Sequence, residues 1–138
     1  MNEPETIQRM LRAKTIAVIG LSDDAAKPSH YVSAYMQSLG HHIVPINPSI
    51  NSVLGQQSYS SLSELSIKPD LVTVFRLPKF LPAIVDEMIA LHLPALWIQQ
   101  GIIHHEAAAK AEAHGITVVM DRCIMIESRR QASFSGQH

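Results

Sequence analysis

The stretch from Ile16 to Gly40, "IAVIGLSDDAAKPSHYVSAYMQSLG", predicts a strand, a ligand-binding turn and a helix in direct succession. The apolar run that ends at Gly20 is typical of a parallel strand buried on both faces. Val32 and Met36 belong to an apolar set with helical spacing, which Gly40 ends. The turn between them has Ser22 where a dinucleotide-binding loop has its second glycine. We therefore expect this turn to meet its ligand with side-chain groups as well as with bare backbone.

Four further apolar runs follow, at residues 43–46, 71–75, 95–98 and 116–120. They are too short for helices and largely lack alternation, whereas segments with helical spacing lie between most of them. Strands that alternate with helices predict an α/β fold. Because crossovers between parallel strands are right-handed, we expect a Rossmann-type, doubly wound sheet of five parallel strands. The predicted strand order is 3-2-1-4-5, with helices on both faces of the sheet.

The whole chain, residues 1–138, is predicted to form a single domain, since its length and its hydrophobic share of 46% suit one core. An amphipathic leading helix is expected within residues 1–13. The polar tail, residues 131–138, lacks helical spacing and is expected to fray.

The charge balance argues against some classes of partner. The chain has 11 basic and 12 acidic side chains, and a formal net charge of −1 creates no field that would attract nucleic acid or an anionic membrane. We see no signal peptide and no membrane span, so a cytoplasmic protein is expected. One cysteine excludes an internal disulfide framework, and the eight histidines show no metal-ligand spacing.

The turn after the first strand has the groups of an anion site. Gly20 permits a sharp turn and a close approach to a ligand. Ser29, with Pro28 just before it, is predicted to cap the following helix, whose free N–H groups and dipole favour anions. Ser22 adds a hydroxyl and Lys27 a positive charge, so together these groups fit a diphosphate. The alternative is an ordinary strand-to-helix loop in which Lys27 is solvated.

Residues at the ends of the second and third strands indicate whether the site can accept an additional phosphate. NAD sites usually place a carboxylate after the second strand, but here Asn47 and Pro48 follow it. Without that carboxylate a ribose phosphate is admissible, and Arg76 is placed to bind it in a bidentate manner. The alternative for Arg76 is a surface cation beside Asp70 or Asp86.

The ends of the fourth and fifth strands offer neutral and thiol groups. Gln99 and Gln100 can donate to and accept from amide groups or an adenine edge. Cys123 follows the fifth strand, near the rim of the expected site, where a buried and inert cysteine is the common case. No serine with an obvious base and no paired carboxylates stand at the strand ends, so no catalytic group is predicted.

These motifs together resemble a known family. They are Gly20-x-Ser22, Lys27-Pro28-Ser29-x-Tyr31, Pro45-x-Asn47-Pro48, Gly55, "VFR", "WIQQGI" and "DRC-x-M-x-E". Over residues 6–130 the chain is similar to the small bacterial CoA-binding-domain proteins, which resemble the CoA-binding domain of the succinyl-CoA synthetase alpha subunit. The synthetase domain has a glycine-rich first loop and a lysine after the second strand; this chain has neither, so the site of the 3′-phosphate is open.

The resemblance implies a domain that binds coenzyme A or an acyl-CoA and has no catalysis of its own. The ligand contacts that follow from it and from the strand ends are Gly20, Ser22, Lys27, Pro28, Ser29, Asn47, Pro48, Phe75, Arg76, Ile98, Gln99, Gln100 and Gly101. Two alternatives stay open: a small NADP-type nucleotide binder or oxidoreductase, and an interaction or regulatory protein with a vestigial cleft. Protein partners are also open, a homodimer among them.

A bound CoA would bring its own thiol to the strand ends. Its pantetheine arm is long enough to cross several of them and to reach Cys123. Thiol–disulfide exchange between Cys123 and CoA is therefore one expectation, and an inert, packed Cys123 is the other.

Overall fold

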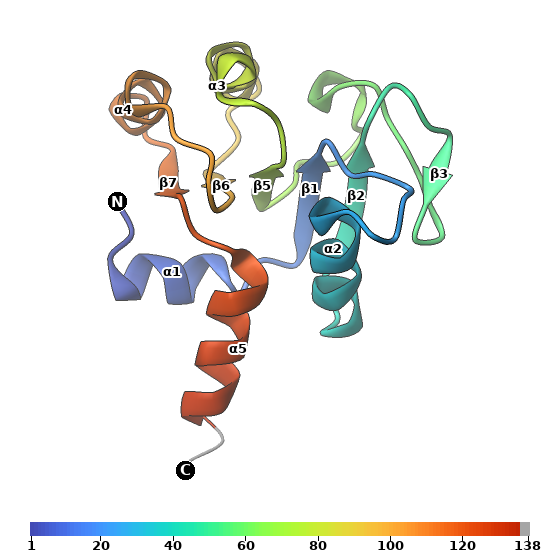
Figure 1. The fold of residues 1–138 in the computed structure, drawn as a ribbon. Helices are drawn as coiled ribbons and strands as arrows, with labels where there is room; N and C mark the ends of the chain where they lie inside the picture. Colours follow the sequence, from blue (N-terminus) through green and yellow to red (C-terminus); the bar gives the residue numbers. More distant parts are fainter. Residues whose placement is uncertain (136–138) are drawn as a thin grey trace.

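A sheet of five parallel strands forms the centre of the computed structural model, which describes residues 1–135 (Figure 1). Its strands are β1 (Thr15–Ile19), β2 (His42–Ile46), β5 (Leu71–Val74), β6 (Ala95–Ile98) and β7 (Thr117–Met120). Their order across the sheet is β2-β1-β5-β6-β7. The predicted Rossmann-type α/β fold with five parallel strands is therefore confirmed.

The predicted strand order is wrong in one respect. The third parallel strand, β5, pairs with β1 and not with β2, so β2 is an edge strand. Pro45 in β2 explains this, because a proline nitrogen cannot donate to a neighbouring strand. The N–H of Asn47 points outward to Tyr59, and the nitrogen of Pro45, two residues earlier, faces the same side. A central β2 would leave its partner strand without that hydrogen bond.

Helices cover both faces of the sheet, as predicted, and within residues 1–135 there are five of them (Figure 1). Helices α3 (Leu81–Ala90) and α4 (His105–Ala113) pack on one face, and their apolar side chains join those of all five strands in one core cluster. Helices α1 (Pro4–Met10), α2 (Pro28–Ser38) and α5 (Ile124–Ser135) pack on the opposite face in a second cluster, which includes the fully buried Trp97.

Short elements fill the connection between β2 and β5. The hairpin of β3 (Ser52–Val53) and β4 (Gln56–Gln57) is followed by a 3₁₀ turn, η1 (Leu62–Glu64). A second 3₁₀ turn, η2 (Pro78–Phe80), leads into α3. No long helix crosses back between residues 47 and 70; Tyr59 instead forms a parallel bridge with Ile46 at the outer edge of β2.

The two ends of the chain differ from their predictions. Helix α1 is shorter than the expected span of residues 1–13. Helix α5 continues to Ser135, so the prediction of a frayed tail is wrong for residues 131–135, while residues 136–138 lie outside the described part of the chain. Within residues 1–135 the longest apolar helices fall short of what a membrane crossing requires.

The outer edge of β7 is covered by a side chain. Asn2 donates through Nδ2 to the carbonyl oxygen of Met120 at 2.8 Å and accepts through Oδ1 from the N–H of Met120 at 2.9 Å. The amide of Asn2 thus pairs with β7 as the backbone of another strand would.

Candidate functional site

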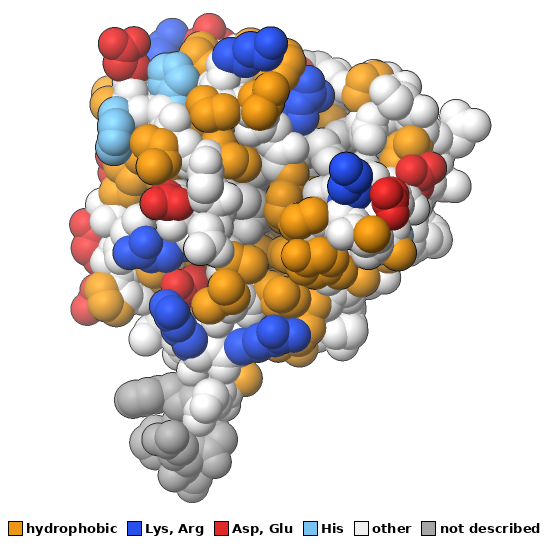
Figure 2. All heavy atoms as spheres, in the orientation of Figure 1, with side chains coloured by type: hydrophobic (Ala, Val, Ile, Leu, Met, Phe, Trp, Pro, Cys, Tyr) orange, Lys and Arg blue, Asp and Glu red, His pale blue; other side chains and the backbone are white. Residues whose placement is uncertain are grey.

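A cleft of about 830 Å³ lies where β1, β5, β6 and β7 end and where α2 and α5 begin. This is the point at which the strand order reverses, since β2 lies on one side of β1 and β5 on the other. The cleft brings together most of the predicted site residues: Gly20, Ser22, Lys27, Pro28, Ser29, Phe75, Arg76, Gln99, Gln100, Gly101 and Cys123. Figure 2 shows hydrophobic side chains gathered around the starts of α2 and α5.

Gly20 brings β1 close to the chain that follows β5. Its φ angle is +88°, and a Cβ atom built on it would lie 2.5 Å from the carbonyl oxygen of Phe75 and 3.0 Å from Cδ of Arg76. The backbone contact that requires glycine is therefore made with Phe75. The sequence pointed to a close approach of a ligand at this position, whereas the structure shows that the neighbouring strand end already occupies that side of Gly20.

The predicted cap of α2 is wrong by two residues. The helix begins at Pro28, and Lys27 occupies the N-cap position without a side-chain hydrogen bond. Ser29 lies inside the first turn, where its Oγ accepts from the N–H of Ser22 at 3.0 Å. The hydroxyl oxygen of Ser22 accepts in turn from the N–H of Asp24 at 3.0 Å. These bonds hold the loop against the helix start and leave the hydroxyl protons of both serines free to donate.

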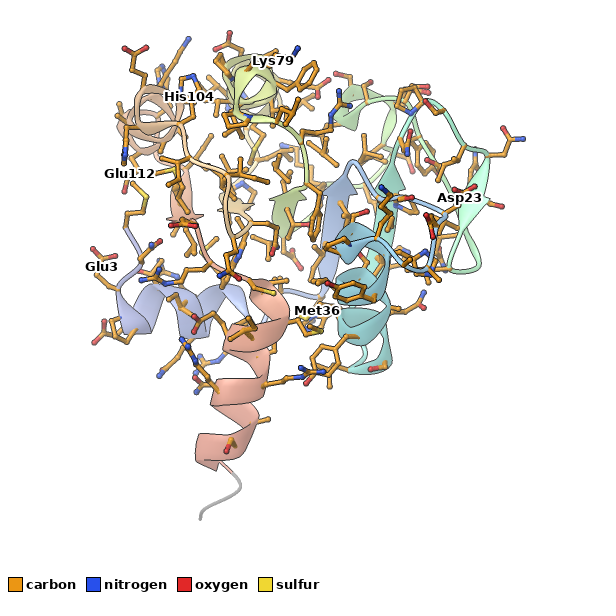
Figure 3. All side chains as sticks on the ribbon, viewed as in Figure 1. Glu3, Asp23, Met36, Lys79, His104 and Glu112 are labelled. Atoms are coloured by element: carbon orange, nitrogen blue, oxygen red, sulfur yellow. The ribbon has the colours of Figure 1, made fainter. Side chains whose placement is uncertain are left out.

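The two aspartates of this loop lie away from the cleft. Asp23 and Asp24 are exposed and line no part of it. Figure 3 shows Asp23 on the outer side of the loop, toward the β3–β4 hairpin. Their charges therefore do not oppose an anion at the start of α2.

The charges that do line the cleft are positive. They are Lys27 and Arg76, and among the described residues no aspartate or glutamate shares the lining with them. The guanidinium of Arg76 lies 4.0 Å from the ring centroid of Phe80. Neither cation forms an ion pair within the described chain. Such a lining favours an anionic ligand.

The alternative in which Arg76 pairs with a nearby aspartate is wrong. Asp70 accepts from backbone N–H groups at the opposite end of β1. Asp86 pairs with Lys110 at 2.6 Å. Both candidate partners are therefore engaged elsewhere, and Arg76 is left on the aromatic ring at the rim of the cleft.

Gln99 places a buried, unpaired donor in the wall of the cleft. Its side chain is 2% exposed, and Oε1 accepts from the N–H of Ile124 at 3.2 Å. The other end of the amide, Nε2, has no partner among the described residues. Leaving a buried donor unpaired costs about 1–3 kcal/mol, so an acceptor from a ligand or from water is expected there. Gln100, by contrast, is exposed at the rim.

A second helix, α5, also begins at the site. The first i to i−4 bond of α5 runs from the N–H of Glu127 to the carbonyl of Cys123, so the N–H groups of Met125 and Ile126 precede it. Residues of the lining that were not predicted are Tyr31, Val32, Leu77, Pro78, Phe80, Ile102, Met125 and Ile126. Several of these residues could have been predicted from the sequence, because they stand directly after the end of a strand or at the start of a helix.

Three predicted contacts lie outside the cleft lining. Ile98 is fully buried in the sheet. Asn47 donates through Nδ2 to the carbonyl oxygen of Leu21 at 2.9 Å and accepts from the N–H of Ser49 at 2.9 Å. Asn47 thus joins the loop after β1 to the loop after β2, and Pro48 follows it on the outer side.

Comparison with known proteins identifies the family of the chain and its structural relatives. Residues 14–129 match the model of a CoA binding domain family. The Bacillus subtilis protein YneT is 40% identical over 125 residues, which are 91% of this chain and 93% of YneT. A solved structure from Thermus thermophilus, cell-free ID.343, superposes with a TM-score of 0.87 at 37% identity and covers 94% of this chain and 98% of its own.

A more distant match is part of a larger enzyme. The ADP-forming acetate–CoA ligase I of Archaeoglobus fulgidus is 23% identical over 142 residues, which span 94% of this chain but 21% of the ligase. The resemblance found in the sequence motifs is therefore confirmed, and the chain belongs to the CoA-binding domain family.

Proposed function

We propose that this chain binds coenzyme A or an acyl-CoA in the cleft at the strand ends, reversibly and without catalysis of its own. The observation that carries the proposal is the cleft lining itself, which combines two unpaired cations with two helix starts and, in the described residues, no carboxylate. CoA bears a diphosphate and a ribose phosphate, so it needs such positive groups. Membership of the CoA-binding domain family supports the same ligand.

The diphosphate is assigned to the start of α2. The N–H of Ser29, the hydroxyl of Ser22 and the ammonium of Lys27 all belong to the loop and first turn that line the cleft. A helix start of this kind offers free backbone donors and a favourable dipole to phosphate. Arg76, across the cleft on the loop after β5, is assigned to the ribose phosphate, since guanidinium groups bind phosphate in a bidentate manner.

The pantetheine arm is assigned to the β6 and α5 side of the cleft. This side combines the unpaired Nε2 of Gln99 with the apolar side chains of Ile102, Met125 and Ile126. Pantetheine has the same mixture, since its amide carbonyls alternate with methylene and methyl groups. A buried amide donor beside an apolar wall therefore fits this part of the ligand better than it fits a second phosphate.

The lining also supports binding in preference to catalysis. General acids and bases in enzymes are most often histidine, aspartate or glutamate. None of these three residue types lines the cleft in the part of the chain that the structure describes. We therefore propose a module that holds its ligand for release or for sensing.

Mass spectrometry of gently purified protein, followed by calorimetry, tests this function. CoA or an acyl-CoA is expected among the co-purified ligands, and CoA is expected to bind to the emptied protein more tightly than NADPH. Tighter binding of NADPH would favour a nucleotide-binding oxidoreductase. Binding of neither ligand would leave an interaction protein with a vestigial cleft.

Replacement of Lys27 by alanine is expected to weaken CoA binding by roughly tenfold, because one charge-assisted hydrogen bond to phosphate is lost. The melting temperature of the free protein should barely move, since this exposed side chain makes no ion pair in the described residues. Lys68→Ala is the matched control, because Lys68 is also exposed but lies outside the cleft. Equal weakening by both substitutions would show only a general effect of net charge.

A further inference from the structure

Cys123 lines the cleft at the point where α5 begins. It is the one cysteine of the chain and is half-buried, with its carbonyl oxygen accepting the first helical bond of α5 from Glu127. It lines the same cavity as Lys27 and Arg76 and also packs against the edge of the second core cluster. A thiol in this position is reachable from the cleft, although position alone does not assign it a role.

Gln99 supplies the second observation. Its Oε1 is bonded at 3.2 Å to the N–H of Ile124, the residue directly after Cys123. The side-chain amide is therefore fixed beside the start of α5, and its unpaired Nε2 is buried in the wall that Cys123 shares. A donor in this state is satisfied by an acceptor on a bound molecule or on water, and an amide carbonyl of a ligand is one such acceptor.

The pantetheine arm of CoA has the required spacing. Only two methylene groups separate its last amide from its sulfur. With the carbonyl of its last amide on Gln99 Nε2, the arm would carry its sulfur only these two methylene groups further along the wall that Cys123 shares. The neighbouring side chains of Met125 and Ile126 are apolar and suit the methylene groups between them.

We propose that Cys123 is a thiol–disulfide exchange site for CoA, an inference that rests on the proposed function. The oxidant is the symmetrical disulfide of CoA. The thiolate of Cys123, after losing its proton to solvent, attacks one sulfur of that disulfide; a new bond forms between Sγ and this sulfur, and the original disulfide bond breaks. The second CoA leaves as a thiolate. Cys123 is oxidised, one CoA is reduced, and a reducing thiol reverses the step.

Incubation of the protein with CoA disulfide, followed by intact-mass measurement, tests the proposal. One CoA is expected to be added per chain, and the adduct should disappear with reductant and be absent in Cys123→Ser. Glutathione disulfide is the comparison reagent. Because the cleft binds the CoA moiety and raises the local concentration of its disulfide, CoA disulfide should react at least about tenfold faster at equal concentration. Saturating desulfo-CoA, which occupies the cleft without a thiol, should remove this advantage.

Gln99→Met removes the amide donor with little change of volume; it also removes the acceptor of the Ile124 N–H, so the reaction with glutathione disulfide is the control for a shifted start of α5. It is expected to slow the reaction with CoA disulfide by roughly tenfold and to leave the reaction with glutathione disulfide unchanged, because only the former uses the amide. If this buried substitution disturbs folding, the wild-type protein still tests the point, because saturating desulfo-CoA should slow its reaction with CoA disulfide. Equal rates with the two disulfides, or no adduct at all, would overturn the exchange site.

Calorimetry of the wild-type protein with reduced CoA, in the presence of reductant, separates this inference from the proposed function. Binding without adduct formation contradicts the exchange site alone. Absence of binding contradicts the proposed function, and any modification of Cys123 would then be that of an ordinary accessible thiol.

Discussion

Replacement of Gly20 by alanine is expected to lower the free energy of unfolding by roughly 2–5 kcal/mol. A residue with a Cβ atom costs about 1–2 kcal/mol at the positive φ of this position. The new Cβ would also stand 2.5 Å from the carbonyl oxygen of Phe75, which is backbone and cannot rotate away. Forcing such an overlap in packed structure costs a further 1–3 kcal/mol or so. Urea unfolding, followed by circular dichroism, measures the change.

Gly115→Ala is the matched control for this substitution. Gly115 also has a positive φ, +82°, but no atom lies within 4 Å of a Cβ built on it. It should therefore show the backbone cost alone, about 1–2 kcal/mol. Similar losses for the two variants would mean that β1 and β5 separate easily at their ends. Gly20→Ala is also expected to bind CoA poorly even where it is folded, because Arg76 follows directly after the displaced Phe75.

Replacement of Arg76 by glutamine is expected to reduce the affinity for CoA by tenfold to a hundredfold. A hydrogen bond to a charged group contributes about 1.5–3 kcal/mol, which corresponds to that range of dissociation constants. The loss should be much smaller for dephospho-CoA, which lacks the ribose phosphate assigned to this guanidinium. Calorimetry measures the affinities of the wild type and of Arg76→Gln for CoA and for dephospho-CoA. The wild type should prefer CoA, and the variant should bind the two ligands with similar affinity.

Arg12→Gln serves as the control for charge. Arg12 is exposed at the opposite end of the sheet, on the segment that precedes β1, so it cannot contact a ligand in the cleft. Its replacement should leave both affinities within twofold or so, since distant exposed charges are screened. An equal preference for CoA in wild type and Arg76→Gln would remove Arg76 from the phosphate site and leave Lys27 as the cation to test.

The five strands and the cleft at their ends could be predicted because their signals are local. A short apolar run that ends in a polar or glycine turn identifies a buried parallel strand without knowledge of its neighbours. The rule that ligands bind at strand ends then collects distant loops into one place. Lys27, Arg76 and Gln99 were found in this way, and all three line the same cleft.

The predictions of strand order and of the helix cap were wrong because both features depend on neighbouring residues or strands. The order of the strands depends on which edge of β1 receives β5, and only Pro45 carried that information in the sequence. Ser29 has the residue type of a cap, but the helix begins at Pro28, two residues before the predicted start, and the Ser29 hydroxyl accepts from Ser22 instead. The ligand contact predicted for Asn47 stays a prediction, because the structure shows only that its amide joins two loops.

The two unlike borders of the sheet have a consequence for how copies of this chain can associate. At β7 the Asn2 amide saturates the outward N–H and carbonyl of Met120, and at β2 the imino nitrogen of Pro45 interrupts the row of donors. Both borders therefore offer another molecule fewer unpaired backbone groups than a bare edge strand would. We expect self-association to favour helical or loop surfaces over the sheet edges, and we expect removal of Asn2 to expose the backbone of Met120 at one border.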